Sequence, residues 1–331
     1  MIASFMESTK PVNLSEKLFD VAVSQKPIRA GFGEGLLQAG REDSRVVALC
    51  ADLKESTKMD AFAKEFPERF VEIGVAEQNL VTVASGMAAM GKIPFCSSYA
   101  MFSPGRNWEQ IRTTIAYNNA NVKVVGSHTG VSVGPDGGTH QALEDIALMR
   151  VLPRMIVIAP CDAIEARKAT LALARHVGPA YLRLAREKTP IITTEDTPFE
   201  IGKANLLLDT PRPSVALISC GSLVYNTLMA ARQLQQEGIE ALVLNLHTIK
   251  PLDAAAVLDV AKRAGKVVTI EEHQIAGGMG SAVTELLAEQ LPVPIRFIGV
   301  RDQFGQSGTP EELITHYGMD VVSIVRTAKS I

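Results

Sequence analysis

The chain has 331 residues, a formal net charge of −3 and a hydrophobic content of 47%. This length predicts two domains, and the hydrophobic content is enough for two buried cores. A charge this close to neutral, without a long basic run, argues against a nucleic-acid-binding protein. No apolar run reaches the ~18 residues of a membrane-spanning helix, and residues 1–10 lack the pattern of a signal peptide. We therefore expect a cytoplasmic protein without nucleic-acid or membrane partners.

The four cysteines, Cys50, Cys96, Cys161 and Cys220, are scattered along the chain. No pair of them has the spacing of a metal or redox site. Buried, reduced thiols are the prediction, and such thiols also favour a cytoplasmic location.

Residues 1–24 are predicted to form a helical lead-in, because Leu14, Leu18 and the pair at 21–22 recur at helical spacing. From residue 25 to residue 190, short β-branched runs alternate with amphipathic segments. The predicted strands are residues 45–50, 69–73, 122–126, 155–159 and 180–184, and the predicted helices are residues 77–90 and 162–176. Nearly continuous apolar runs are typical of strands buried on both faces, so this alternation predicts an α/β domain with a mostly parallel sheet.

Residues 191–211 are predicted to be a linker, because prolines and turn formers interrupt the periodicity there. Residues 212–331 then repeat the alternation and predict a second, smaller domain of the same class. Its predicted strands are residues 215–220, 239–246, 266–271 and 295–300, and its predicted helices are residues 222–236, 253–264 and 279–290. A capping box from Thr309 to Glu312 predicts one more helix. The fold class is thus α/β, with two consecutive domains, each a mostly parallel sheet flanked by helices.

The first candidate site residue is Glu77, within the run GVAEQN from Gly74 to Asn79. A strand-like segment and a glycine turn precede it, and a helix starts at about this residue. A carboxylate in the first turn of a helix is favoured by the helix dipole, so a purely structural role is the alternative.

The second candidate is the loop at residues 127–141, which follows the predicted strand at 122–126. It contains His128, Asp136 and His140 together with four glycines. Open α/β sheets bind ligands outside the carboxyl ends of their strands, and polar, glycine-bearing loops there are site candidates. An ordinary connection is the alternative. Zinc is disfavoured, because the two histidines have no third ligand at suitable spacing.

The third candidate is the run from Pro94 to Phe102, in which Tyr99 and Phe102 would share a face if the segment is helical. Phe95 and Trp108 lie nearby in the sequence. Aromatic residues make up only 5% of the chain, so this cluster stands out, with core packing as the alternative.

Taken together, these residues resemble the pyrimidine-binding domain of transketolases in order and approximate spacing. The matching positions are Glu77, Tyr99, Phe102, His128, Asp136 and His140, with Arg29 and Asp52 upstream. The EEH run at residues 271–273 and the GGMG run at residues 277–280 resemble the C-terminal domain of the same family. The resemblance covers residues 25–331, and the ordered set carries it, since each motif alone is short.

A full-length transketolase also has an N-terminal domain whose Gly-Asp-Gly…Asn motif holds Mg²⁺ and the cofactor diphosphate. That motif is missing from the sequence, which starts about where the second half of the family starts. The resemblance therefore implies the C-terminal subunit of a split transketolase. It implies a separate N-terminal, diphosphate-binding subunit as partner, a homodimer core of this chain and thiamine diphosphate shared with the partner. It also implies Mg²⁺ or Ca²⁺ held by the partner, with no metal ligand in this chain.

The resemblance also implies roles for individual residues. Glu77 would hydrogen-bond the ring nitrogen N1′ of the cofactor aminopyrimidine and control its protonation. Tyr99 and Phe102 would stack on that ring, and Asp52 would lie near the cofactor. Catalytic roles are implied for Glu77, His128 and His140.

Substrate contacts are implied as well, to hydroxyl groups and to a terminal phosphate. The implied substrate-binding residues are Arg29, Ser56, His128, Asp136, His140 and Arg186. Arg183 competes with Arg186 for its position, and the spacing does not decide between them. The implied activity is transfer of a two-carbon ketol unit between phosphorylated sugars.

Three positions depart from the family pattern. Gln78 stands where a histidine is common, Thr129 where an aspartate is frequent and Gly138 where a proline is frequent. A related thiamine enzyme is one alternative, either deoxyxylulose-phosphate synthase or the β chain of a 2-oxo acid decarboxylase. These often have a second histidine directly after the position of His140, where this chain has Gln141. The other alternative is a non-catalytic assembly partner, which would have no need of Glu77, His128 and His140.

Overall fold

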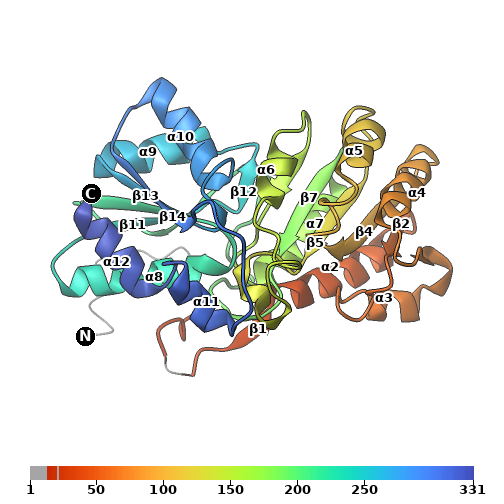
Figure 1. The fold of residues 1–331 in the computed structure, drawn as a ribbon, viewed down its shortest axis with the longest axis horizontal. Coiled ribbons are helices and arrows are strands. Elements are labelled where there is room, and N and C mark those ends of the chain that lie inside the picture. The colour runs from red at the N-terminus through yellow and green to blue at the C-terminus, as the bar shows by residue number, and fades with distance from the viewer. Residues whose placement is uncertain (1–12, 21) are drawn as a thin grey trace.

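The computed structural model describes residues 13–20 and 22–331. It has two consecutive α/β domains, each with a mostly parallel sheet flanked by helices, so the predicted fold class is confirmed (Figure 1). A small antiparallel pair, β1 (Gln25–Pro27) and β8 (Lys188–Pro190), joins the two ends of the first domain.

The first sheet has seven strands in the order β12-β6-β7-β5-β4-β2-β3. All neighbours are parallel except β12, which runs antiparallel to β6. The strands are β2 (Val46–Cys50), β3 (Phe70–Glu72), β4 (Ile93–Tyr99), β5 (Lys123–Ser127), β6 (Ile156–Ile158), β7 (Ala180–Leu184) and β12 (Thr248–Lys250). Parallel strands align their carboxyl ends along one edge, and this is where the candidate residues of the first domain gather.

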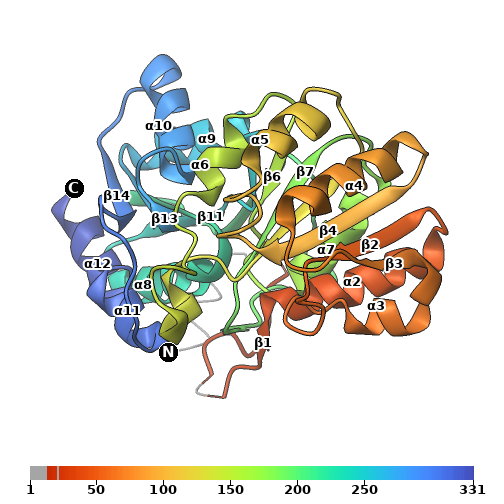
Figure 2. The same ribbon diagram turned by 45° about the vertical axis from the view of Figure 1, so that its right-hand side comes forward.

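Helices cover both faces of this sheet (Figure 2). One layer contains α2 (Ile28–Glu42), α3 (Asp60–Glu65), the turn η1 (Pro67–Arg69) and α7 (Ala163–Arg175). The other contains α4 (Glu77–Ala89), α5 (Trp108–Gln110), the π-helical segment η2 (Ile111–Ala116) and α6 (Asp145–Arg150). Gly31 lets α2 lie directly on α7, because a Cβ atom there would be 1.8 Å from the carbonyl oxygen of Ala163.

The second sheet has five strands in the order β14-β13-β10-β11-β9, with β9 antiparallel to β11. The strands are β9 (Asn205–Leu208), β10 (Val215–Ser219), β11 (Ala241–Asn245), β13 (Val267–Gln274) and β14 (Ile295–Val300). The helical elements are η4 (Gly221–Leu223), α8 (Val224–Gln236), α9 (Ala254–Ala264), α10 (Met279–Gln290), α11 (Pro310–His316) and α12 (Val321–Ser330). The predicted capping box at Thr309 and Glu312 starts α11.

Two of the predicted boundaries are wrong. The predicted linker contains β9, because three leucines there form a short edge strand between proline-containing turns. Residues 13–20 form turns instead of a helical lead-in. Within these residues the backbone forms only turn bonds, such as Leu18 N–H to the Ser15 carbonyl at 3.0 Å. The Ser15 N–H donates instead to the distant Ile192 carbonyl at 2.9 Å, and Leu18 is buried in the core of the second domain. Residues 1–12 and 21 of the lead-in lie outside the described residues.

Within residues 13–20 and 22–331, no helix is both long and apolar enough to cross a bilayer. In the same part of the chain, no three His, Cys, Asp or Glu side chains are grouped as metal ligands would be. All four cysteines are buried and unpaired, as predicted.

Buried polar groups connect the two domains. Glu165 on α7 accepts hydrogen bonds from the Cys161 N–H at 2.7 Å and from Nδ2 of Asn245, at the end of β11, at 2.8 Å. His273 on β13 accepts from the Ile146 N–H at the start of α6, at 3.2 Å. Because such groups are costly to bury without partners, these bonds fix how the domains dock.

We predict that Glu165 makes the stability of this junction depend on pH. Burial first, and then the charge of Asp162, raise the pKa of Glu165 from its ordinary value of 4.5 to about 7. The pKa of Glu165 is higher in the folded state than in the unfolded state, so its protonated form contributes its full stabilisation below pH 4.5. This contribution is lost as the pH rises through about 7. Glu165→Gln should abolish this loss, which amounts to up to roughly 3 kcal/mol in the free energy of unfolding. The amide has no charge to bury, and it can accept from the Cys161 N–H and donate to the side-chain oxygen of a rotated Asn245.

The measurement is urea unfolding of wild type and Glu165→Gln at intervals from pH 5 to pH 8. Glu289→Gln, which changes an exposed glutamate on α10, is the matched control and should keep the wild-type slope. The same pH slope in wild type and Glu165→Gln would contradict the prediction.

Candidate active site

Glu77 begins α4 and is only 2% exposed. Its Oε2 atom accepts a hydrogen bond from Nη1 of Arg106 at 2.6 Å, and its backbone carbonyl accepts from Nδ2 of Asn107 at 2.7 Å. Its other carboxylate oxygen has no hydrogen bond within the described residues. The helix dipole and Arg106 together stabilise the negative charge in this buried position.

Four aromatic rings predicted for the site lie in one cluster. The Tyr99 and His128 rings stack with centroids 3.8 Å apart. The His140 and Phe102 rings are nearly perpendicular, with centroids 5.4 Å apart. Tyr99 ends β4 and Phe102 lies in the following turn, so the pair does not share a helix face. Phe95, in contrast, packs against Phe32 in the core beneath α2, as the core-packing alternative expected.

His128 directly follows β5 with a φ of 58°, a left-handed backbone conformation that is uncommon outside glycine. Conformations of this kind concentrate at functional sites. Its Nδ1 atom lies 2.9 Å from the Ser127 hydroxyl. Burial, and then the positive charges of Arg29 and Arg186, lower the pKa of His128 to about 3. His128 is therefore a neutral imidazole near pH 7, with one nitrogen to donate and one to accept.

A positively charged group of side chains adjoins the aromatic cluster. Arg29 donates through Nε to the Arg186 carbonyl at 3.1 Å and through Nη1 to the Ser56 carbonyl. Arg186 donates to the Val133 carbonyl at 2.6 Å and to Asp136 at 3.2 Å. Burial and the nearby Arg186 charge lower the pKa of Arg29, because two like charges held close together oppose ionisation. A bound anion would relieve this repulsion, so the arrangement suits a phosphate.

Arg183 is not part of this group. It is buried in an ion pair with Asp145 at 2.8 Å and also donates to the Glu272 carbonyl at 2.9 Å. Tyr181 donates to the same Asp145 carboxylate at 2.7 Å. Arg183 therefore supports the domain junction, and Arg186 is the arginine at the site.

Asp52 is the predicted residue that the structure leaves apart. It follows β2 with a φ of 58°, at the same edge of the sheet, and its side chain is exposed. Its backbone N–H donates to Glu72 at 2.7 Å, but no described hydrogen bond or ion pair joins its carboxylate to the aromatic cluster. Its role near a cofactor stays a prediction.

The second domain holds the loop that carries Asp136 and His140. Glu272, only 2% exposed, accepts from the Ser132 N–H at 2.6 Å and from the Ser222 hydroxyl at 2.6 Å. The Ser132 bond holds η3 (Val131–Asp136) against β13, and the Ser222 bond joins η4 to the same carboxylate. A Cβ atom at Gly138 would lie 2.5 Å from the Gly305 carbonyl oxygen, which explains why the common proline is missing there. The loop is therefore positioned from both domains.

Sequence reasoning missed Arg106 and Asn107, which both contact Glu77, and it gave no role to Glu272. Arg106 lies 29 positions after Glu77 in the chain, so no spacing pattern links the two residues. The only available signal was the position of Arg106 just after the aromatic run.

The site suits a flat heteroaromatic ring that donates hydrogen bonds. Glu77 offers a free carboxylate oxygen, and Tyr99 and Phe102 offer ring faces. A cavity of about 500 Å³ opens beside Glu77, lined by residues 75–79, Thr82, Arg106 and Gln110. The neutral His128, the His140 ring and two guanidiniums continue from the ring position toward an anion site.

Residues 24–191 match the sequence model of the transketolase pyrimidine-binding domain, and residues 202–324 match that of the transketolase C-terminal domain. The chain belongs to the transketolase family, as predicted. It is 41% identical to the 6-deoxy-6-sulfo-D-fructose transketolase subunit of Clostridium sp. (strain MSTE9), over 95% of this chain and 97% of that protein. It is 39% identical to an apulose-4-phosphate transketolase subunit of Phocaeicola vulgatus, over 91% of this chain and 96% of that protein.

A solved structure described as a split-gene transketolase in an inactive β4 tetramer has a TM-score of 0.86 to this chain. The identity is 42%, covering 92% of this chain and 97% of that one. Against full-length transketolase from Rattus norvegicus, the identity is 36% and the chain spans 48% of that protein. The chain thus matches proteins named as transketolase subunits over nearly their whole length, and it spans about half of the rat transketolase.

We predict that the two neighbouring arginines differ sharply in their effect on stability. Arg183→Met should cost about 3–5 kcal/mol, because it leaves Asp145 buried without its counter-charge. Arg186→Met should cost less than about 1 kcal/mol, because this side chain is partly exposed. Urea unfolding of both variants at pH 7 measures the difference, and equal losses would contradict this assignment of the two residues.

Proposed function

We propose that this chain is the C-terminal subunit of a thiamine-diphosphate-dependent transketolase, which moves a two-carbon ketol unit between phosphorylated sugars. The observation that carries the proposal is the continuous path from buried Glu77, through the aromatic cluster, to the guanidiniums of Arg29 and Arg186. Its order matches that of a cofactor ring, a reacting sugar and a terminal phosphate. On this proposal the chain is a transferase subunit.

When bound, thiamine diphosphate supplies the nucleophilic carbon for ketol transfer. Glu77 would hold a proton at the pyrimidine ring nitrogen, while Tyr99 and Phe102 orient the ring and exclude water from it. His128 and His140 would exchange protons with carbonyl and hydroxyl oxygens of the sugar. Asp136 would accept a hydrogen bond from a sugar hydroxyl.

We further propose that a separate N-terminal subunit binds the cofactor diphosphate and its Mg²⁺ or Ca²⁺. The match to about half of a full-length transketolase supports this division. The two relatives named as transketolase subunits support it as well. In this proposal two copies of the chain form a dimeric core that two partner subunits complete. The four buried, unpaired thiols favour a cytoplasmic location for the assembly.

A related thiamine enzyme acting on 2-oxo acids is the second candidate. Gln141, at the position where those enzymes often have a histidine, favours the transketolase. It is buried and donates to the carbonyls of Val131, Gly134 and Gln306, so it shapes the site loop. Thr129, another departure, donates to the Leu184 carbonyl at 3.3 Å. Because relatives act on a sulfo sugar and on apulose 4-phosphate, we leave the individual sugars open.

The central test is calorimetric titration of thiamine diphosphate with Mg²⁺ into this chain, first alone and then with an N-terminal transketolase subunit from the same organism. We expect weak or no binding by the chain alone, and tight binding with ketol transfer in the mixture. Glu77→Gln should still assemble with the partner and should lose about 100-fold or more in kcat. Tight binding or full activity of this chain alone would overturn the division of the site.

We also predict that Arg186 recognises the substrate phosphate. In the assembled enzyme, Arg186→Met should raise KM for a phosphorylated sugar about tenfold or more, because one charge-assisted hydrogen bond is worth roughly 1.5–3 kcal/mol. The KM for the same sugar without phosphate should change much less, because only contacts within the chain, such as that of Arg186 with Asp136, are lost there, and it serves as the internal control. Steady-state kinetics with both substrates decide the matter, and equal effects on the two would rule out phosphate recognition by this residue.

A further inference from the structure

Arg106 places a flat cation between two parts of the candidate site. Its Nη1 atom donates to Glu77 at 2.6 Å, and its guanidinium carbon lies 4.8 Å from the centre of the Phe102 ring. Glu77 is almost fully buried, whereas the Arg106 side chain is 49% exposed. A buried carboxylate without a counter-charge is strongly destabilising. Arg106 therefore supplies the charge that the Glu77 carboxylate requires.

Arg106 is held less firmly than Arg183 at the domain junction or Arg29 at the site. Arg183 bonds both oxygens of Asp145 and a backbone carbonyl, and Arg29 bonds two backbone carbonyls. Within residues 13–20 and 22–331, the Arg106 side chain has one hydrogen-bond partner, Glu77. Since Glu77 is fixed at the start of α4, the arginine is the member of the pair that can move.

An aminopyrimidine ring requires the same two partners. It is flat, it donates hydrogen bonds to a carboxylate when its ring nitrogen is protonated, and it stacks on aromatic faces. A guanidinium group has the same three properties. One Glu77 oxygen is free, but both groups would also lie over the Phe102 ring, where Arg106 already stands, so they compete for one position.

We propose that Arg106 is a displaceable placeholder for the cofactor pyrimidine. It neutralises Glu77 until the ring binds, and it then turns toward solvent. This proposal rests on the proposed function, because the competing ring is that of thiamine diphosphate. The apparent Kd equals the intrinsic Kd divided by the fraction of time that the position is free of Arg106. If Arg106 is paired with Glu77 nine-tenths of the time, the apparent Kd is about tenfold higher than the intrinsic one.

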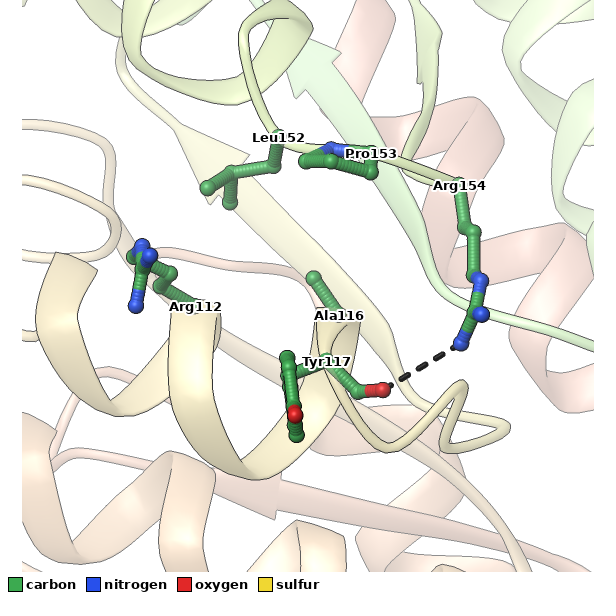
Figure 3. A pocket seen from close by; sticks show the side chains of 6 residues that line it. All are labelled: Arg112, Ala116, Tyr117, Leu152, Pro153 and Arg154. Atoms are coloured by element: carbon green, nitrogen blue, oxygen red, sulfur yellow. Dashed lines mark hydrogen bonds between the residues drawn. The ribbon is translucent and has the colours of Figure 1, made fainter.

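The test compares wild type with Arg106→Met, which keeps the length of the side chain and removes its charge. Thiamine diphosphate with Mg²⁺ is titrated into the complex of each protein with the partner subunit. We expect Arg106→Met to lower the Kd about three- to tenfold. Arg112→Met is the matched control and should leave the Kd unchanged. Figure 3 shows Arg112 on η2, at a separate cavity of about 520 Å³ that it lines with Ala116, Tyr117 and residues 152–154.

Thermal unfolding of the free chain supplies a second readout. Arg106→Met should lower Tm in the wild-type background, because Glu77 loses its counter-charge, and should have little effect in a Glu77→Gln background. An equal loss of Tm in both backgrounds would overturn the proposal, since it would show that the two residues are not coupled.

The binding results separate the two proposals. If wild type binds the cofactor and Arg106→Met binds it equally or more weakly, the placeholder is wrong and the proposed function stands. If neither protein binds thiamine diphosphate in the presence of the partner, the proposed function and the placeholder both fail.

Discussion

The buried carboxylate of Glu272 is the point on which the site and the domain arrangement both depend. It accepts from the Ser132 N–H and the Ser222 hydroxyl, and its backbone carbonyl accepts from Arg183. One short stretch of the second domain thus holds the loop of Asp136 and also the β7 strand of the first domain. The loop at residues 131–136 is thus held by the second domain, which contributes to the geometry of the candidate site.

A second constraint is that a buried carboxylate, Glu77, and a more exposed one, Asp136, are each paired with an arginine within the chain. Glu77 is paired with Arg106 and Asp136 with Arg186. His128 needs no counter-charge because it stays neutral: burial and two nearby guanidiniums lower its pKa. The two carboxylates are therefore paired in the single chain, whereas Arg29 and Arg186 repel each other and leave the site favourable to an anion.

The sequence was sufficient for the fold class and for most strands and helices. The family resemblance brought Tyr99 and Phe102 together with the two histidines, whereas Phe95 of the same aromatic run lies in the core. The strands and helices depend on local periodicity, and the place of the loops on the rule that loops gather at the carboxyl ends of parallel strands. The sequence failed for β9, whose few leucines are flanked by turn residues, and for residues 13–20, whose backbone pairs across the chain. It could not find the Glu77–Arg106 pair or choose between Arg183 and Arg186, since both depend on side-chain contacts between distant segments.

The strand β12 limits which parts of this chain could be inherited or exchanged separately. Residues 248–250 follow β11 of the second sheet, yet they pair with β6 and form the edge of the first sheet. A fragment that stopped near residue 190 would leave the apolar β6 as an open edge, where strands of other molecules could add. A recombination or graft that keeps the β6–β12 pairing would therefore have to move both domains together, although each domain has its own sheet.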